Sequence, residues 1–417
     1  MLKTSNMRFS TALREETRKK IENIGYADIV VGIPTYFSQN TIAHVIEQVA
    51  KGLDRYFNDK KALIFISDGG STDDTREVAE AVDVSKYNVE KVVGIYRGIP
   101  GKGSALRAIF ESAEFLKATA IATFDSDLRS ITPEWVKNII EPIYTGYDFV
   151  APYYLRWKFD GTITNTIAYN MTRALYGKKI RQPIGGDFGF SRPLVKDYLD
   201  NEVWDTEVAK FGIDIWMTTN AIVDNYKICQ ARLGAKIHNE KDPTQLSDMY
   251  REVVGTIFKL MEQPKYESYW KKIKGSTDVE ILGEFVGEEP EPFSIDINNL
   301  IEYFKIGYNN FAPVWKSILE EKDFKIIEKL YMTETAENFI MPVDTWVRIV
   351  YRYAAYFHKT PRQKFKVLNT MIPLYNAKVA SLVNELKDMT VEEAEKYYDN
   401  QALRFEEMKD YLIKIWE

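Results

Sequence analysis

Short apolar runs alternate with helical stretches through the first half of the chain, and this alternation most constrains the fold. The apolar runs are rich in Ile, Val and Ala and lie at 29–33, 62–66, 92–96 and 120–124. Amphipathic helical patterns separate them, at about 40–56 and from 101 to roughly 116. Strands and helices that alternate in this way build a mostly parallel, doubly wound sheet. The sequence therefore predicts an α/β domain, with further strands at about 148–154 and 228–233.

The rest of the chain divides by pattern into an arm, a linker and a helical region. We expect a helical N-terminal arm, the α/β domain, a Gly- and Pro-containing acidic linker and a helical C-terminal domain, at 1–26, 27–274, 275–299 and 300–417. A chain of 417 residues, 45% of them hydrophobic, can bury cores large enough for two such domains.

Composition excludes several classes of protein. A formal net charge of -6 argues against a nucleic-acid-binding protein, which is usually basic. The single cysteine, Cys229, excludes an intrachain disulfide framework and a multi-cysteine metal cluster; it lies in an apolar stretch and is expected to be buried. No segment approaches the run of about 18 apolar residues that a membrane span needs, and the N-terminus lacks a signal-peptide core. We therefore expect no membrane span and a cytoplasmic protein.

Two carboxylates follow directly on the apolar run that ends at Phe124. Asp125 and Asp127 lie at the carboxyl end of a predicted strand, the edge where open α/β sheets bind ligands. Side chains two residues apart share a face if the strand continues through them. Carboxylate oxygens there suit Mg²⁺ or Mn²⁺, which can neutralise a diphosphate. His238 follows another predicted strand and could complete the metal shell, whereas His44 and His358 lie in helical stretches and are interpreted as structural.

Other segments at the same predicted edge have a structural and a functional interpretation. The loop after the first strand, which contains Pro34 and Tyr36, either ends that strand or cradles a nucleotide base and ribose. The turn at 101–104 can bring backbone amides and the Lys102 ammonium to an anion at a helix N-terminus. The paired glycines at 185–186 are a plain loop or let a substrate lie against bare backbone. Asp214 is a helix N-terminal acid or a ligand for sugar hydroxyls.

Six short motifs stand in a fixed order between about residues 28 and 260: D-G-G-S-T-D-D at 68–74, G-K-G at 101–103, F-D-S-D-L at 124–128, Q-P-I-G-G at 182–186, G-I-D at 212–214, and His238. Together they resemble the GT-A glycosyltransferases. More narrowly, they are similar to the retaining mannosylglycerate and glucosylglycerate synthases and their glucosyl-3-phosphoglycerate synthase relatives. The helical C-terminal region also resembles that of the mannosylglycerate synthases.

This resemblance implies roles for individual residues. Contacts with a nucleoside-diphosphate sugar, whose base is guanine or uracil and whose hexose is glucose or mannose, would come from Pro34, Tyr36, Asp68, Lys102 and Asp125. The divalent cation, Mg²⁺ or Mn²⁺, would be bound by Asp127 and His238. Asp214 would hold hydroxyls of the donor hexose, and the Ile184 carbonyl would lie beside the anomeric carbon, in a pocket shaped by Gly185 and Gly186. The relatives retain anomeric configuration by front-face attack, so the metal and Lys102 would stabilise the departing diphosphate.

The sequence departs from the phosphoglycerate-using relatives at two places. Their first loop carries an Asn-Glu pair where this chain has Phe37 and Ser38, which leaves the base preference open. Their acceptor segment contains an arginine that is absent from the sequence G-T-I-T at 161–164. Without this arginine the chain lacks a partner for the acceptor's phosphate, which favours D-glycerate over 3-phosphoglycerate as the acceptor. Arg156, Thr162 and Thr164 are the acceptor-binding candidates. The C-terminal helices are expected to cover the acceptor side or to form a contact in a homo-oligomer.

The resemblance implies hexosyl transfer in the synthesis of a compatible solute. Two other functions are alternative interpretations of the sequence. A sugar-nucleotide pyrophosphorylase needs a glycine-rich basic loop after the first strand, and the loop at 34–38 has neither a glycine nor a basic residue. A non-catalytic nucleotide-sugar-binding protein would be expected to lose a metal ligand or the lysine at 102, and all are present. The sequence therefore favours an enzyme.

Overall fold

The computed structural model of the protein describes residues 9–238, 243–287 and 289–417. The chain forms two compact units that interleave along the sequence. The first comprises Met1–Leu155, Arg181–Asn239 and Val279–Glu291, and the second Arg156–Ile180, Glu240–Asp278 and Pro292–Glu417. These units differ from the linear domains expected from pattern, whose boundaries stay a prediction; residues 1–8 of the expected arm lie outside the described residues.

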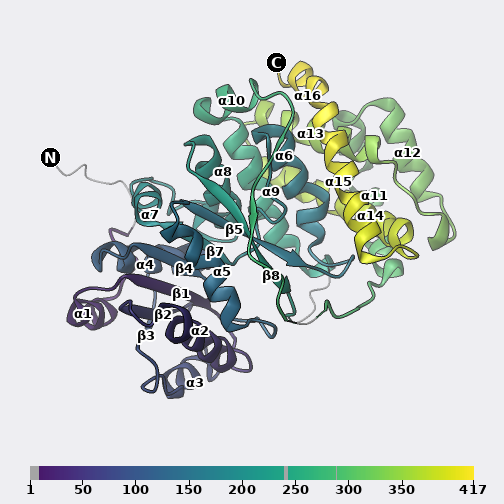
Figure 1. Ribbon diagram of the computed structural model, residues 1–417. Coiled ribbons are helices and arrows are strands. Elements are labelled where there is room, and N and C mark those ends of the chain that lie inside the picture. The colour runs from purple at the N-terminus through teal and green to yellow at the C-terminus, as the bar shows by residue number, and fades with distance from the viewer. Residues whose placement is uncertain (1–8, 239–242, 288) are drawn as a thin grey trace. The chain divides into compact units, whose positions relative to one another are not determined.

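An eight-stranded sheet forms the centre of the first unit (Figure 1). From edge to edge its strands are β10 (Ile281–Leu282), β8 (Ile228–Ala235), β5 (Phe149–Leu155), β7 (Phe188–Ser191), β4 (Ala120–Thr123), β1 (Ile29–Thr35), β2 (Ala62–Asp68) and β3 (Val89–Ile95). All neighbouring pairs are parallel except the two that β7 makes, with β4 and β5. The mostly parallel α/β sheet and each strand expected from the sequence are confirmed.

Helices cover both faces of this sheet. Alternate residues of β1, namely Ile29, Val31 and Ile33, share one buried core with α2 (Ile42–Phe57) and α5 (Pro133–Tyr144). The opposite face carries α4 (Lys102–Phe115), α7 (Arg192–Leu199) and α8 (Ile213–Val223), and there Phe110 packs edge-on against Phe190 of β7. The short helices α1 (Glu15–Ile24) and α3 (Thr75–Ala81) complete the unit. Cys229 is buried in β8 as expected, and burial raises the pKa of its thiol to about 12.

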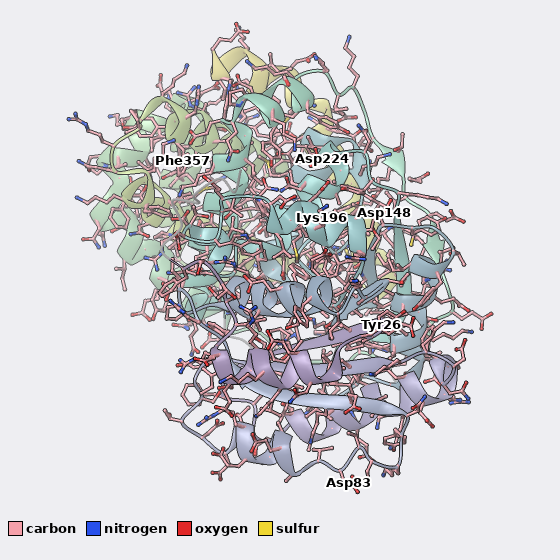
Figure 2. The ribbon with its side chains drawn as sticks, turned by 90° about the vertical axis from the view of Figure 1, so that its left-hand side faces the viewer. Tyr26, Asp83, Asp148, Lys196, Asp224 and Phe357 are labelled. Carbon is pink, nitrogen blue, oxygen red and sulfur yellow. The ribbon has the colours of Figure 1, made fainter. Side chains whose placement is uncertain are left out.

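The second unit is helical, as expected of the C-terminal region. Its helices are α6 (Tyr169–Tyr176), α9 (Ser247–Met261), α10 (Pro264–Trp270), α11 (Ile297–Ile318), α12 (Glu321–Tyr331), α13 (Val343–Lys359), α14 (Lys364–Leu386), α15 (Val391–Glu407) and α16 (Lys409–Trp416). A two-stranded ribbon joins β6 (Lys178–Lys179) to β9 (Thr277–Asp278). Aromatic packing fills its core: Phe357, labelled in Figure 2, is buried and meets Phe258 edge-on. Among the helices described, none has the length and apolarity to cross a membrane.

The close approach of α4 to β1 depends on a glycine in the middle of the strand. A Cβ at Gly32 would lie 2.4 Å from Cγ2 and 2.5 Å from Cδ1 of Ile109, a fully buried residue of α4. Such a separation is far shorter than a van der Waals contact. Because Lys102 opens α4, the spacing between this helix and the strand also sets where the Lys102 side chain begins.

We predict that Gly32→Ala lowers the free energy of unfolding by about 1–3 kcal/mol, since the new methyl group overpacks the space that Ile109 fills. Chemical denaturation of Gly32→Ala, Ile109→Val and the double variant measures this. Ile109→Val removes Cδ1, so the double variant is expected to lose less stability than the sum of the single variants. A Gly32→Ala protein as stable as the wild type, or strictly additive losses, would contradict the prediction.

Candidate active site

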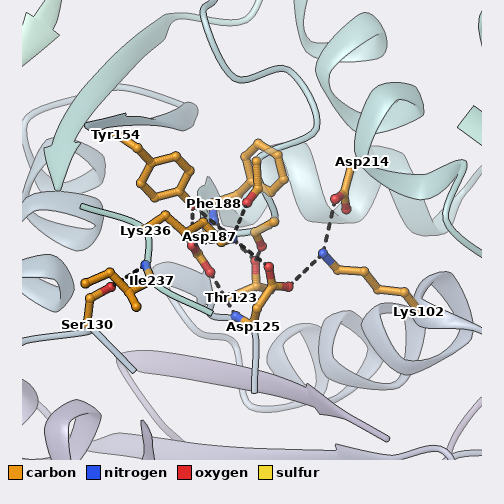
Figure 3. A network of polar contacts seen from close by, with 12 residues as sticks. Lys102, Thr123, Asp125, Ser130, Tyr154, Asp187, Phe188, Asp214, Lys236 and Ile237 are labelled. Atoms are coloured by element: carbon orange, nitrogen blue, oxygen red, sulfur yellow. Dashed lines mark hydrogen bonds and ion pairs between the residues drawn. The ribbon is translucent and has the colours of Figure 1, made fainter. Parts of the chain in front are cut away.

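A chain of alternating charges lies at the carboxyl edge of β4 (Figure 3). The Lys102 ammonium is 2.9 Å from Asp125 Oδ1 and 3.1 Å from Asp214 Oδ2. The Lys236 ammonium is 2.8 Å from Asp125 Oδ2 and 3.1 Å from Asp187 Oδ2. Asp125 is therefore held between two lysines, each of which also reaches a second carboxylate.

Different elements bring these five side chains together. Asp125 follows β4, Asp187 precedes β7, and Lys236 follows β8, whereas Lys102 and Asp214 stand in the first turns of α4 and α8. Because β7 runs antiparallel to β4, its amino end meets the carboxyl end of β4, and the Asp125 amide donates to Asp187 Oδ1 at 2.8 Å. Topology thus gathers residues that are far apart in sequence at one edge of the sheet.

Burial and charge shift the pKa values in this cluster in opposite directions. Burial alone lowers the pKa of Lys102, but the carboxylates of Asp125 and Asp214 outweigh it and raise that pKa. Burial alone raises the pKa of Asp125, but Lys102 and Lys236 outweigh it and hold that pKa well below its usual range. The shared carboxylate at the centre of the cluster therefore stays ionised.

The two outer carboxyls shift upward. Burial raises the pKa of Asp187 against the opposing charge of Lys236, and burial raises the pKa of Asp214 against the opposing charge of Lys102. Asp214 Oδ1 is buried and has no hydrogen-bond donor, although Oδ2 is paired with Lys102. A buried carboxylate oxygen without a donor is costly, so it marks a place where a hydroxyl donor from a ligand fits.

The predicted metal ligands lie on two neighbouring segments. The Arg129 amide donates to the Ile237 carbonyl and the Ile237 amide to Ser130 Oγ, both at 2.9 Å, which brings the segments that carry Asp127 and His238 side by side. The described ranges contain no cluster of three or more His, Cys, Asp or Glu side chains able to hold a metal ion. One carboxylate and one imidazole fit a cation whose remaining ligands are phosphate oxygens and water. Whether they bind one stays a prediction.

The strand does not continue through Asp125 and Asp127, so the condition under which their side chains would share a face is not met. β4 ends at Thr123, and residues 126–127 form a turn. Hydroxyl groups hold this turn against the loop after β1: Ser38 and Ser126 hydroxyl oxygens are 2.7 Å apart, and Thr41 Oγ1 donates to the Ser126 carbonyl at 2.7 Å. The pleat of a strand therefore does not set the directions of the two carboxylates.

The loop after β1 exposes two aromatic rings at this edge. Pro34 is the penultimate residue of β1; Tyr36 and Phe37 follow the strand and are 62% and 52% exposed, with their ring centroids 4.3 Å apart. Phe37 has a φ of 51°, which a non-glycine residue adopts only where its surroundings impose it. Here the Phe37 amide donates to Ser71 Oγ at 3.0 Å. The protein holds two large apolar rings in solvent, as a stacking surface requires.

Asp68 is fully buried, and its carboxylate accepts hydrogen bonds mainly from the turn that follows it. Its Oδ1 accepts from the Gly70 and Ser71 amides at 2.8 Å each, and its Oδ2 accepts from the hydroxyls of Ser71 and Thr35 at 2.7 and 3.1 Å. The carboxylate therefore shapes the turn after β2. Its predicted contact with a nucleotide stays a prediction.

The amides of the turn before α4 are also engaged. The Gly101 amide donates to the Tyr96 hydroxyl at 2.8 Å, and the Gly103 amide donates to the Lys210 carbonyl at 3.2 Å. Any contact of this turn with a phosphate would thus rely mainly on the Lys102 ammonium.

The paired glycines lie against protein groups. A Cβ at Gly186, where φ is 91°, would be 2.2 Å from Asp125 Oδ2, and a Cβ at Gly185 would be 2.3 Å from Cγ of Pro152. Glycine is needed at both positions because Asp125 and Pro152 occupy the space that a Cβ atom would need. Ile184 before them is half-buried.

The acceptor candidates belong to the second unit. Arg156 pairs with Asp160 at 3.0 Å, and the Thr162 hydroxyl lies 2.6 Å from the Tyr375 hydroxyl. Thr164 is buried at the start of a π-helical turn, Thr164–Ala168. Their predicted role stays a prediction.

Sequence reasoning assigned no role to Lys236, Asp187 or Tyr154. The Tyr154 hydroxyl lies 3.0 Å from the Gly185 carbonyl and also contacts Asp187. A signal for Lys236 was present, because a lysine directly after an apolar strand obeys the same edge rule as Asp125. Asp187 precedes its strand, so only the antiparallel direction of β7 brings it to this edge.

Residues 30–200 match the family described as Glycosyl transferase family 2. The chain is 25% identical over 248 residues to glucosyl-3-phosphoglycerate synthase of Mycolicibacterium smegmatis, a match that covers 55% of this chain and 76% of that protein. It is 29% identical over 170 residues to glycosyltransferase AglJ of Haloferax volcanii, covering 39% and 50% of the two chains.

Among solved structures, the crystal structure of glucosyl-3-phosphoglycerate synthase from Mycobacterium tuberculosis with Mg²⁺ and uridine diphosphate is 24% identical. It has a TM-score of 0.43 and covers 57% of this chain and 82% of that one. On the family match and the sequence relatives, residues 30–200 form a glycosyl transferase family 2 domain, and the chain is a hexosyltransferase of the GT-A type that resembles the glucosyl-3-phosphoglycerate synthases.

Proposed function

We propose that the protein transfers glucose or mannose, with retention of anomeric configuration, from a nucleoside-diphosphate sugar to D-glycerate or a related small acceptor, in the synthesis of a compatible solute. The observation that carries the proposal is the partly buried Asp214–Lys102–Asp125 chain of charges at the carboxyl edge of the sheet. It offers a cation for a diphosphate and, at Asp214 Oδ1, a carboxylate oxygen for sugar hydroxyls.

Each part of the donor has a matching group. The exposed rings of Tyr36 and Phe37 suit the flat face of a base, and Lys102, only 13% exposed, suits the diphosphate. Asp127 and His238 would hold Mg²⁺ or Mn²⁺, which supplies positive charge to the leaving diphosphate. The relative from Mycobacterium tuberculosis is described with Mg²⁺ and uridine diphosphate. Developing charge on the leaving group is then stabilised by a lysine that the protein has already oriented.

A second acceptor has a specific observation in its favour. Several relatives are named glucosyl-3-phosphoglycerate synthase, so 3-phosphoglycerate is the alternative acceptor. Against it, the segment 161–164 has no arginine, and the Thr162 hydroxyl pairs with Tyr375. We favour glycerate.

We also propose that the protein forms a homo-oligomer and is located in the cytoplasm. Analytical ultracentrifugation would measure the oligomeric state.

A product matrix tests the proposed reaction. UDP- and GDP-linked glucose and mannose are each incubated with D-glycerate or 3-phosphoglycerate, and products are identified by mass spectrometry and their anomeric configuration by NMR. We expect an α-linked hexosylglycerate from one donor, loss of product with EDTA and recovery with Mg²⁺ or Mn²⁺.

His238→Ala is expected to lower turnover at least tenfold in the same assay, whereas the matched control His44→Ala is not. A much faster reaction with 3-phosphoglycerate would overturn the acceptor preference, and no transfer from any donor would overturn the function.

The aromatic pair gives a separate prediction about the donor base. Tyr36→Ala and Phe37→Ala are each expected to weaken binding of the preferred nucleoside diphosphate by about tenfold, because base stacking contributes roughly 1–3 kcal/mol. Calorimetric titration with UDP and GDP measures this. Phe115→Ala is the matched control, since Phe115 is another exposed ring, 44% exposed, at the far end of α4. Unchanged affinity in both loop variants would place the base elsewhere.

Asp214→Asn is expected to lower kcat at least tenfold and to change how stability depends on pH. A carboxyl whose pKa is raised in the folded state loses stability as pH rises from its ordinary value, 3.8, through the folded value. The variant does not titrate there. Its free energy of unfolding, relative to the wild type, should therefore rise as the pH increases above 3.8.

Asp59→Asn provides the opposite control, because the Lys60 ammonium lowers the pKa of the exposed Asp59 carboxyl. Denaturation at several pH values measures both variants. A relative stability of Asp214→Asn that falls over this range would contradict the assignment.

A further inference from the structure

Lys236 is the most highly coordinated side chain of the cluster. Besides Asp125 and Asp187, its ammonium lies 3.4 Å from the Tyr154 hydroxyl (Figure 3). It also lies 2.7 Å from the Gly185 carbonyl. These partners come from β5, from the segment before β7 and from the end of β4. Lys236 itself follows β8, so one ammonium group ties together four adjacent strands, in the order β8-β5-β7-β4.

The two lysines of the cluster differ in how firmly they are held. The Lys102 side chain is 13% exposed and makes two ion pairs, whereas the Lys236 side chain is 4% exposed and has four acceptors. An ammonium has three hydrogens, so Lys236 is saturated by protein groups. Lys102 can exchange a carboxylate for an incoming anion, and Lys236 cannot do so without depriving the fully buried Asp187 carboxylate of its counter-ion.

This difference matters once a donor binds, and here the argument rests on the proposed function. If Lys102 turns toward the donor diphosphate, Asp125 loses one of its two cations. Asp125 then keeps Lys236 as counter-ion, so it stays ionised and in place. The same ammonium holds the Gly185 carbonyl and Asp187, and therefore fixes the segment that follows Ile184.

We propose that Lys236 is a positioning residue for transfer: it holds Asp125 and the segment 185–187 in a fixed arrangement while Lys102 is released to the donor diphosphate. Its contribution is to the placement of the hexose and not to the affinity for the nucleotide. Misplacement of reacting groups by about 1 Å can cost roughly 100-fold in rate. The expected signature is a loss in kcat with little change in nucleotide affinity.

Lys236→Met tests this, since methionine fills much of the space but carries no charge. With the donor and acceptor that give most product in the matrix above, we expect kcat to fall by about 100-fold and the dissociation constant of UDP or GDP with Mg²⁺ to change by less than about threefold. Lys236→Arg, which keeps the charge, should recover at least about tenfold of the loss. Lys91→Met is the matched control, because the Lys91 ammonium likewise has several protein acceptors: the carbonyls of Ala79, Glu80 and Val82. It should keep wild-type kcat.

Several outcomes would overturn the proposal. Wild-type kcat in Lys236→Met would do so, as would equal losses of nucleotide affinity and kcat, or no recovery with arginine. If a thermal-unfolding measurement shows that Lys236→Met is not folded, Tyr154→Phe tests the proposal instead. This variant removes only the hydroxyl that contacts Lys236, Gly185 and Asp187. We expect about a fivefold fall in its kcat with unchanged nucleotide affinity, and an unchanged kcat would overturn the role. A wild-type protein that binds neither UDP nor GDP would contradict the proposed function, and this proposal with it.

Discussion

The pairing of Asp125 with two lysines is the interaction on which the edge of the sheet depends. Three carboxylates and two ammonium groups lie in one largely buried cluster, and each lysine is shared by two carboxylates. Burying any one of these charges alone would be strongly unfavourable, so each depends on the others. The cluster is still incomplete: Asp214 retains an oxygen without a donor. A hydroxyl donor from a bound hexose would stabilise that oxygen.

The scaffold around the cluster leaves little freedom. Gly32 lets α4 approach β1, which places Lys102, and Gly186 has no side chain where the Asp125 carboxylate lies. Hydroxyl groups of Ser38 and Thr41 hold the loop after β1 to the turn at Ser126. The rigid elements thus fix the charges, while the rings at the end of β1 remain exposed. The candidate site residues thus lie on loops that a fixed frame holds, as is usual for ligand sites in open α/β sheets.

Much of the fold could be predicted from the sequence because local patterns encode it. Parallel strands buried on both faces appear as continuous apolar runs, and the runs at 29–33 and 62–66 are indeed β1 and β2. β7 could not be predicted, because four residues, Phe188–Ser191, carry no usable period and their pairing is with strands distant in sequence. The direction of Asp127 was also beyond reach, since it depends on where β4 stops. The interleaving of the two units arises from long-range contacts that no local window contains.

The sequence by itself determined the strand–helix alternation, the edge at which polar residues gather, and the motif order that resembles the GT-A glycosyltransferases. Each of these features is encoded by residues that are neighbours in sequence. Only the tertiary structure decided which charges meet: that Lys102 pairs with both Asp125 and Asp214, that Asp68 serves its own turn, and that Lys236 and Asp187 belong to the cluster. Pairing of charges requires closeness in space. Here that closeness is created by strand order and by the reversed direction of β7, which bring together residues as far apart as 102 and 236.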